Sequence, residues 1–94
     1  MYKTEVILSK KAEKDLSKLP YVIEAKLWAW VDSVKHSGLR DIRKLSGYHD
    51  EPLKGDRKGQ RSIRLNRAYR AIYRADESSQ IELVEILEVN KHDY

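Results

Sequence analysis

The spacing of hydrophobic positions predicts one long helix in the first half of the chain. Between Tyr21 and Ser37, apolar side chains recur every three or four residues, at Ile23, Leu27, Trp30, Val31 and Val34. This is the spacing that places side chains on one face of an α-helix. Pro20 suits the first turn of such a helix, and Gly38 suits its end. We therefore expect a helix over Tyr21–Ser37 that packs one face against a core.

A strand and a shorter helix are predicted before it. Glu5-Val6-Ile7-Leu8 is a short β-branched run, which is typical of a strand. Ser9 can cap the helix that follows. In that helix Ala12, Leu16 and Leu19 share a face, and charged residues lie between them.

The second half of the chain predicts extended structure. Apolar and β-branched residues over Gln60–Asn66, Tyr69–Ala75 and Ile81–Val89 indicate three strands, separated by turns at 67–68 and 76–79. Between Leu39 and Lys58, glycines and a proline predict an irregular segment. The pattern there admits one short strand at 51–53.

The element order β-α-α-β-β-β predicts an α+β fold in which two N-terminal helices pack on one face of an antiparallel sheet. Ninety-four residues correspond to one domain, spanning 1–94. The other face of the sheet would be open. Because side chains alternate along a strand, Arg64, Arg70 and Arg74 can all point toward that open face.

Charge is concentrated on these predicted strands. The segment 54–74 has eight basic residues and one acid, a local net charge of +7 in a chain whose total is +4. The residues after it, 76–94, have six acids and one lysine. Arginine binds phosphate oxygens in a bidentate manner. The alternative is an ordinary solvated surface, but the density of arginine favours binding of phosphate or RNA.

Composition excludes several other classes of site. The chain has no cysteine, so disulfides, thiolate zinc sites and cysteine nucleophiles are excluded. No glycine-rich phosphate loop, dinucleotide signature or metal-ligand spacing is present, and we expect no cofactor and no metal. The charged start, Met1–Glu5, predicts no signal peptide. No apolar run is long enough to span a membrane, and we expect a cytoplasmic protein.

Two further segments contain candidate acid–base groups. The terminal Lys91-His92-Asp93-Tyr94 follows a predicted strand that would lie beside Arg70. It is either a frayed tail or a functional one, since histidine transfers protons near neutral pH. The second segment is His49-Asp50-Glu51-Pro52-Leu53-Lys54, which is either a simple loop or part of the same site.

The run from Pro52 to Gly59, followed by Ser62-Ile63-Arg64 and Tyr69-Arg70, resembles the HigB branch of the RelE toxin superfamily. These proteins are the toxins of bacterial type II toxin–antitoxin pairs. The resemblance covers the element order of the whole chain and is specific from about residue 51 onward. It implies a RelE-like, microbial-ribonuclease-like α+β fold. It also implies metal-independent cleavage of mRNA in the ribosomal A site and neutralisation by a cognate antitoxin.

The resemblance also implies roles for individual residues. Lys54 matches the family lysine that faces the scissile phosphate, and Arg70 matches the arginine that stabilises the transition state. Glu51 stands where the related YoeB toxin has a catalytic glutamate, whereas HigB has a histidine there. HigB ends in Asp-Tyr-His and YoeB in Tyr-His-Tyr, so the end of this chain has the same residue types in another order. We assign His92 as the general acid and leave Glu51 and Tyr94 as alternative bases.

The remaining cations are predicted to bind RNA of the message or the ribosome: Arg57, Lys58, Arg61, Arg64, Arg67, Arg74 and Lys91. Two other functions share parts of this pattern. A ParE-type toxin has the same fold but inhibits DNA gyrase and needs no nuclease residues. A non-catalytic RNA-binding module would bind RNA and leave it intact.

Overall fold

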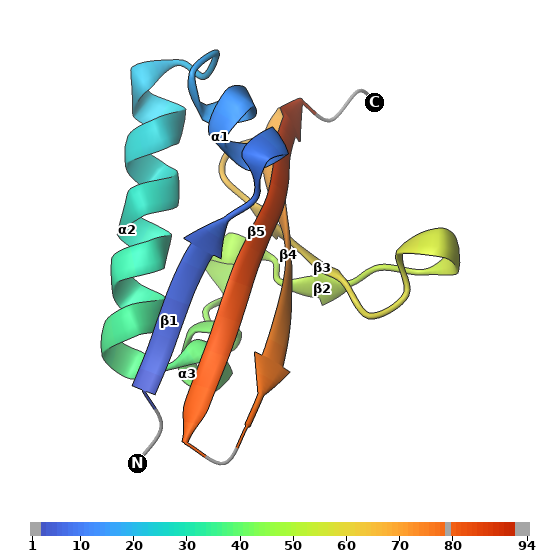
Figure 1. Cartoon of the computed structure of the whole chain (residues 1–94). Helices are drawn as coiled ribbons and strands as arrows, with labels where there is room; N and C mark the ends of the chain where they lie inside the picture. The colour runs from blue at the N-terminus through green and yellow to red at the C-terminus, as the bar shows by residue number, and fades with distance from the viewer. Residues whose placement is uncertain (1–2, 79, 92–94) are drawn as a thin grey trace.

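The structure, a computed structural model, describes residues 3–78 and 80–91. These residues form a five-stranded sheet with helices packed on one face (Figure 1). The strands are β1 (Lys3–Leu8), β2 (Glu51–Pro52), β3 (Arg61–Arg64), β4 (Tyr69–Glu77) and β5 (Ile81–Lys91). The helices are α1 (Lys10–Leu16), α2 (Tyr21–Ser37) and α3 (Leu39–Ile42).

The α+β class and the packing of helices on one face of the sheet are confirmed. The sheet order is β1-β5-β4-β3-β2. Strands β2 to β5 form the predicted antiparallel meander. Strand β1 pairs in parallel with β5, so the whole sheet is mixed. The direction reverses at each of the three antiparallel pairings from β2 to β5, so β5 runs parallel to β1 while β2 runs opposite to both (Figure 1).

Helix α2 has the bounds that its hydrophobic spacing predicts. Leu27, Trp30 and Val34 from this helix are fully buried and belong to the same core cluster as strand residues such as Val84 and Ile86. The helix therefore contributes one face to the core, as expected for an amphipathic segment.

The two short helices differ from the predictions. Helix α1 begins after Ser9, whose Oγ accepts a hydrogen bond from the Ala12 amide at 3.0 Å, but it ends at Leu16 rather than near Leu19. Helix α3 lies in a segment that we expected to be irregular. It forms because Leu39 and Ile42, three residues apart on one face, are both buried. Gly38 precedes it with a φ of +85°, which allows the sharp change of direction.

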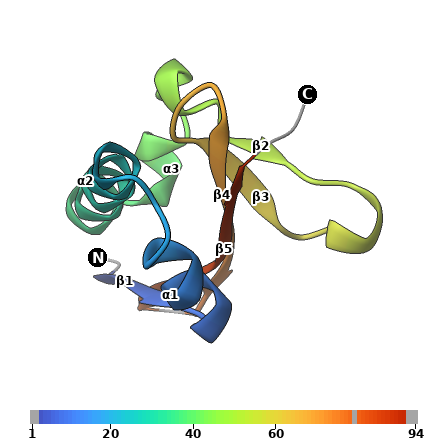
Figure 2. The same cartoon turned by 90° about the horizontal axis from the view of Figure 1, so that it is seen from above.

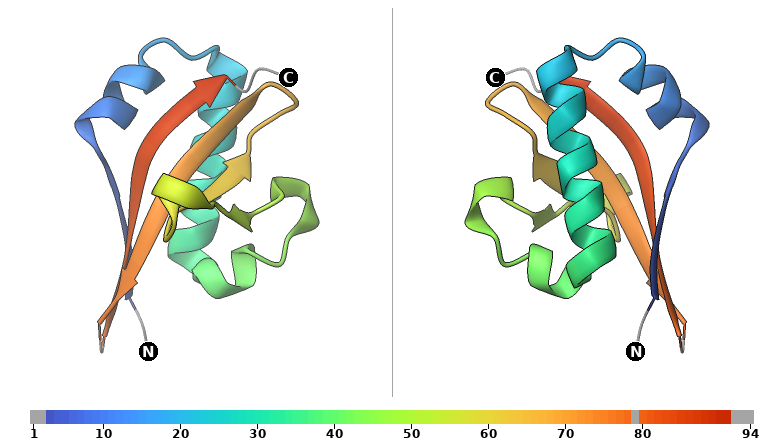
Figure 3. Two further views of the ribbon diagram at one scale, coloured as in Figure 1. Left: turned by 90° about the vertical axis from the view of Figure 1, so that its right-hand side faces the viewer. Right: turned by 90° about the vertical axis from the view of Figure 1, so that its left-hand side faces the viewer.

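We call the face of the sheet opposite the helices the outer face. Viewed from above, the helices lie on one side of the strands, and the segment 53–60 projects from the other side (Figure 2). The side views in Figure 3 show the same arrangement. We call the segment 53–60 the arm. It contains a single 3₁₀ turn at Gly55–Arg57, and Leu53 at its start donates a backbone hydrogen bond to Gln60 at its end (2.9 Å).

Candidate active site on the outer face of the sheet

Strand register places the predicted arginines side by side. Arg64 of β3 lies opposite Arg70 of β4, and Arg70 lies opposite Asn90 of β5. Because side chains alternate between the two faces, all three project from the outer face. Arg74, four residues after Arg70 on the same strand, shares that face, as the alternation predicted. A neighbouring row across the same face consists of Glu51, Ser62, Ile72 and Glu88.

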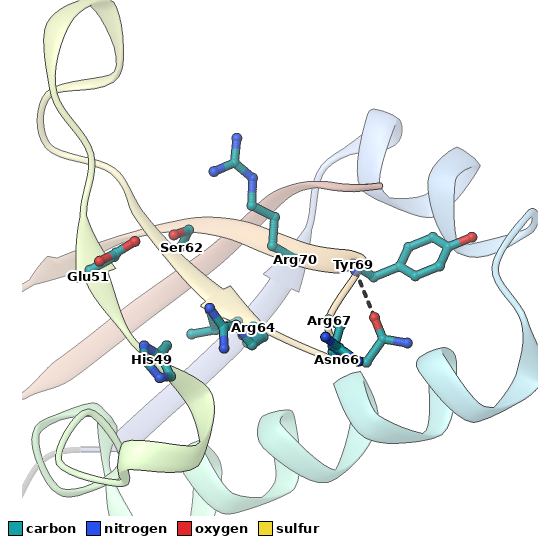
Figure 4. A pocket seen from close by; sticks show the side chains of 9 residues that line it. His49, Glu51, Ser62, Arg64, Asn66, Arg67, Tyr69 and Arg70 are labelled. Carbon is teal, nitrogen blue, oxygen red and sulfur yellow. Dashed lines mark hydrogen bonds between the residues drawn. The ribbon is translucent and has the colours of Figure 1, made fainter. Parts of the chain in front are cut away.

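A pocket of about 60 Å³ opens where these two rows meet β2 and the β3–β4 turn. Its lining combines three arginines with a carboxylate, an imidazole and an amide: Arg64, Arg67, Arg70, Glu51, His49 and Asn66. Figure 4 shows the guanidinium of Arg70 standing away from β4, with Glu51 and Ser62 to one side. Such a pocket is suited to an anion that also needs a proton acceptor or donor beside it.

The β3–β4 turn holds Arg67 at the edge of this pocket. The Asn66 side-chain oxygen accepts hydrogen bonds from the backbone amides of Ala68 and Tyr69, both at 2.8 Å. The bond to Tyr69 is drawn in Figure 4. An asparagine that binds the backbone two and three residues ahead fixes a tight turn. Arg67 therefore sits on a defined turn next to the pocket.

A chain of hydrogen bonds orients Arg70 from the side of β5. Its Nε donates to the Asn90 side-chain oxygen at 3.3 Å, and the Asn90 amide donates to Glu88 at 3.0 Å. Glu88 in turn forms an ion pair with Arg57 of the arm. Within residues 3–78 and 80–91, the side-chain hydrogen bond of Arg70 is made through Nε, and Figure 4 shows its terminal nitrogens directed away from the strand. The hydrogen bond at Nε orients the side chain of Arg70. Its terminal guanidinium nitrogens then have the planar geometry that suits bidentate binding of a phosphate.

The same network sets the charge of Glu88. Partial burial would raise its pKa, but hydrogen bonds from Asn90 and Arg57 and the positive charge of Arg57 outweigh this effect. The pKa of Glu88 is therefore below its ordinary value. The carboxylate stays ionised and holds the arm against β5 at neutral pH.

Other predicted site residues lie outside the pocket. Lys54 and Lys58 are exposed on the arm, on either side of its 3₁₀ turn. Arg57 is on the arm too, but Glu88 holds it to the sheet. Arg74 forms an ion pair with Glu85 at 2.8 Å, farther along the outer face. The pocket thus contains Glu51, Arg64, Arg67 and Arg70 of the predicted set, and it does not contain Lys54.

Arg61 takes a different position from the one predicted for an RNA-binding cation. It lies opposite Tyr73, whose side chain is in the core, and its Nε donates to the Asp50 carboxylate at 2.5 Å. Burial alone would lower the pKa of Arg61, but the hydrogen bond and charge of Asp50 raise it. The reason is alternation: Arg61 and Arg64 are an odd number of residues apart and so belong to opposite faces. Arg61 is a structural residue of the fold.

The predicted catalytic residues His92 and Tyr94 lie outside the described residues. Lys91, the last residue of β5, lies opposite Tyr69, which lines the pocket. Strand β5 therefore ends beside the candidate site.

Three residues that matter to the geometry were not assigned roles from the sequence. His49 lines the pocket, but it precedes β2 and has a left-handed backbone, so strand alternation does not predict its position. Asn90 is found only once the β4–β5 register is known. Asp50 has its carboxylate buried beneath the segment that contributes His49 and Glu51.

Two further properties concern metals and membranes. Across residues 3–78 and 80–91, no group of three or more histidine, aspartate or glutamate side chains is placed to hold a metal ion. None of the helices in this part of the chain is long and apolar enough to cross a membrane.

Comparisons with known proteins identify the fold. No protein-family model matches the chain, and no curated protein matches its sequence significantly. Solved structures do match it. The YoeB/ParE toxin from Agrobacterium tumefaciens superimposes with a TM-score of 0.74 at 20% identity, covering 95% of this chain and 99% of that one. The fold is that of the RelE/YoeB/YafQ toxins.

Two other matches are to toxins bound to their antitoxins. The DinJ–YafQ complex from Escherichia coli gives a TM-score of 0.72 at 20% identity, with coverage of 96% of this chain and 93% of the matched chain. The RelBE2 toxin–antitoxin complex from Mycobacterium tuberculosis gives 0.57 at 27% identity, with coverage of 97% and 98%. The structural neighbours are thus toxins of toxin–antitoxin systems, and their likeness extends over nearly the whole chain.

Proposed function

We propose that this protein is the toxin of a type II toxin–antitoxin system, similar to the HigB branch of the RelE superfamily, and that it cleaves mRNA on the ribosome without a metal. The observation that supports this most directly is the pocket on the outer face. It gathers Arg64, Arg67 and Arg70 around one carboxylate and one imidazole on a toxin-type fold.

The substrate would supply its own nucleophile. In RNA the 2′-hydroxyl lies next to the scissile phosphate, so in-line attack needs neither a protein nucleophile nor a metal. Negative charge then builds on the phosphoryl oxygens. Arg70, held at Nε by Asn90 with its terminal nitrogens directed off the sheet, is arranged to stabilise that charge. Loss of one such donor commonly costs about 2.7–4 kcal/mol in the barrier.

Proton transfer would use groups on the other side of the pocket. Glu51 of β2 is two strands away from β4. Through Ser62 it lies level with Ile72, two residues along β4 from Arg70. With a strand spacing of ~4.8 Å and a rise of ~3.3 Å per residue, their backbones are roughly 12 Å apart. Side chains can extend inward from both sides and leave space for a phosphate between them. Glu51 would take the 2′ proton, and Tyr94 is the alternative base.

A histidine would complete the reaction by protonating the departing 5′ oxygen. His92 is the general acid that we assigned from the sequence, and His49 is a second candidate because it lines the pocket. Either imidazolium would donate one proton as the phosphorus–oxygen bond breaks. The products are a 2′,3′-cyclic phosphate and a 5′-hydroxyl end. Positioned acids and bases typically contribute ~10²–10⁴-fold each.

The exposed cations around the pocket would bind the RNA on either side of the cleavage point. Lys54 and Lys58 are carried on the arm, and Lys91 ends β5 beside the pocket. In this proposal Lys54 reaches the scissile phosphate when RNA lies against the arm. Each phosphate neutralised in this way releases counterions, so binding should weaken steeply as salt is raised.

A cognate antitoxin is the proposed protein partner, and the bacterial cytoplasm the proposed location. The DinJ–YafQ and RelBE2 structures are toxin–antitoxin complexes with the same toxin fold. An antitoxin for this chain would either present acidic residues to the basic outer face or wrap around the helices.

The test is primer extension on mRNA translated in a reconstituted ribosome reaction to which the purified protein is added. We expect cuts positioned by codon, abolished by Arg70→Ala. Arg40→Ala is the matched control, since it removes an exposed arginine of α3 on the other face of the sheet. Uncut mRNA with the wild-type protein would refute the nuclease. Inhibition of DNA gyrase would then support the ParE-like alternative, and RNA binding alone a non-catalytic module.

A further inference from the structure

Asp50 is a buried carboxylate between two residues of the pocket wall. Its side chain is 1% exposed. It accepts hydrogen bonds from Arg61 Nε and from the Tyr73 hydroxyl, both at 2.5 Å. The residues before and after it, His49 and Glu51, both line the pocket. The Asp50 side chain thus lies in the core, while its two neighbours along the chain line the pocket.

The partners of Asp50 belong to two strands of the sheet, and one of them is in the core. Tyr73 is in the middle of β4 and is 1% exposed. Its ring packs on Trp30 of α2, with ring centroids 5.1 Å apart. Arg61 begins β3. Asp50 therefore ties the pocket wall to the central helix and to two central strands at once.

The other contacts of this wall are modest. The His49 amide donates to the Ser46 carbonyl at 3.1 Å, and the partly buried Tyr48 packs against the core. Strand β2 has only two residues, with two register pairs to β3, and both residues are exposed. His49 has a φ of +47°, in the left-handed region that non-glycine residues avoid. Such a backbone conformation persists only where its surroundings determine it. The one strongly buried anchor in this segment is the Asp50 side chain.

We propose that Asp50, acting with Tyr73 and Arg61, is a positioning residue for RNA cleavage: it fixes the backbone so that His49 and Glu51 face the substrate. This inference rests on the function proposed above. Asp50 itself does not reach the pocket and takes no part in proton transfer. Its contribution is to hold His49 and Glu51 in position. This matters because the rate of catalysis falls steeply when reacting groups are misplaced by about 1 Å.

The decisive variants are Asp50→Asn and Tyr73→Phe. Each removes a charge or a hydroxyl while keeping the shape of the side chain. In single-turnover cleavage on programmed ribosomes, we expect the maximal rate to fall roughly 10- to 100-fold. The protein concentration at half-saturation should stay within about twofold, because the exposed cations that bind RNA are untouched.

The matched control is Glu82→Gln. Glu82 is also a buried hydrogen-bonded carboxylate, but it lies near the opposite end of β5 and accepts from Thr4 and from the Leu39 amide. This variant should lower stability without lowering the maximal rate of the folded protein. If Glu82→Gln slows cleavage as much as Asp50→Asn does, the effect is general destabilisation and the proposal is wrong.

A second readout does not depend on activity. In ¹H–¹⁵N spectra, Tyr73→Phe should shift the amides of His49 and Glu51, and the Leu53 amide, now bonded to Gln60, should exchange faster. Unchanged amides together with an unchanged rate would overturn the positioning role. If the wild-type protein cleaves no RNA, the proposed function fails by itself. The amide shifts then still show whether Asp50 holds this segment.

Discussion

Arg64 and Arg70 lie directly opposite each other across β3 and β4, and both line the same pocket. Like charges at opposing positions of a sheet repel each other and destabilise the strand pair. Such a pair lowers stability. In the function proposed above, this cost would be offset when an RNA phosphate binds in the pocket.

Relief of this repulsion gives the first prediction. Arg64→Gln should raise the free energy of unfolding by about 0.2–1 kcal/mol at low salt, because it removes one of two opposing cations. The same change should lower RNA cleavage. Urea unfolding at low and high salt measures the effect, and the gain should shrink as salt screens the pair. A variant that is less stable at every salt concentration would contradict this view.

Acid stability gives the second prediction, through Glu88. Because its folded pKa lies below its ordinary value, ionised Glu88 stabilises the folded protein. That contribution is complete above the ordinary value of 4.5 and is lost as the pH falls toward the folded pKa. Urea unfolding from pH 7 to pH 3 should show wild type and Glu88→Gln converging at the acid end. Parallel pH profiles for the two proteins would show that the ion pair with Arg57 adds nothing.

The third prediction concerns the end of the sheet remote from the pocket. Glu82 is 7% exposed, and its carboxylate accepts hydrogen bonds from the Leu39 amide and the Thr4 hydroxyl, both at 3.1 Å. Glu82→Ala leaves the Leu39 amide buried without this partner. We expect a loss of about 1–3 kcal/mol in the free energy of unfolding. Cleavage per folded molecule should not change, since Glu82 lies at the start of β5 and the pocket lies near its other end. A stability loss below 0.5 kcal/mol would show that water replaces the carboxylate.

Local periodicity was sufficient to predict the parts of the fold that repeat along the chain. The helical spacing of Leu27, Trp30 and Val34 predicts α2, and the period of two in β4 places Arg70 and Arg74 on one face. Both signals extend over several residues. Helix α3 has only four residues and gives no periodic signal. The partner of β1 depends on how the helices return the chain, which no local pattern encodes.

The candidate site shows the same division between features that local sequence predicts and features that depend on long-range contacts. The family resemblance placed Glu51 and Arg70 in one predicted site, and strand alternation placed Arg64 on the same face as Arg70. All three line one pocket, and their roles stay predictions. The supporting residues, Asn90 and Asp50, act through register and burial. Their roles become visible only when β4 is aligned with β5 and when Tyr73 is seen in the core. Sequence reasoning therefore found the groups that line the pocket more easily than the groups that hold them in place.

Alkaline stability provides the last prediction, through the Tyr73 hydroxyl. Burial, followed by its hydrogen bond to Asp50, raises the pKa of Tyr73 well above the ordinary value of 10.0. The folded protein thus holds this proton more tightly than the unfolded chain does. The stabilisation is complete below pH 10 and declines as the pH rises through the range above it. In urea unfolding from pH 8 to pH 11, wild type should lose stability above pH 10 more steeply than Tyr73→Phe. Equal slopes would mean that Tyr73 ionises as freely in the folded protein as in the unfolded chain, and that its bond to Asp50 is not a stable part of the fold.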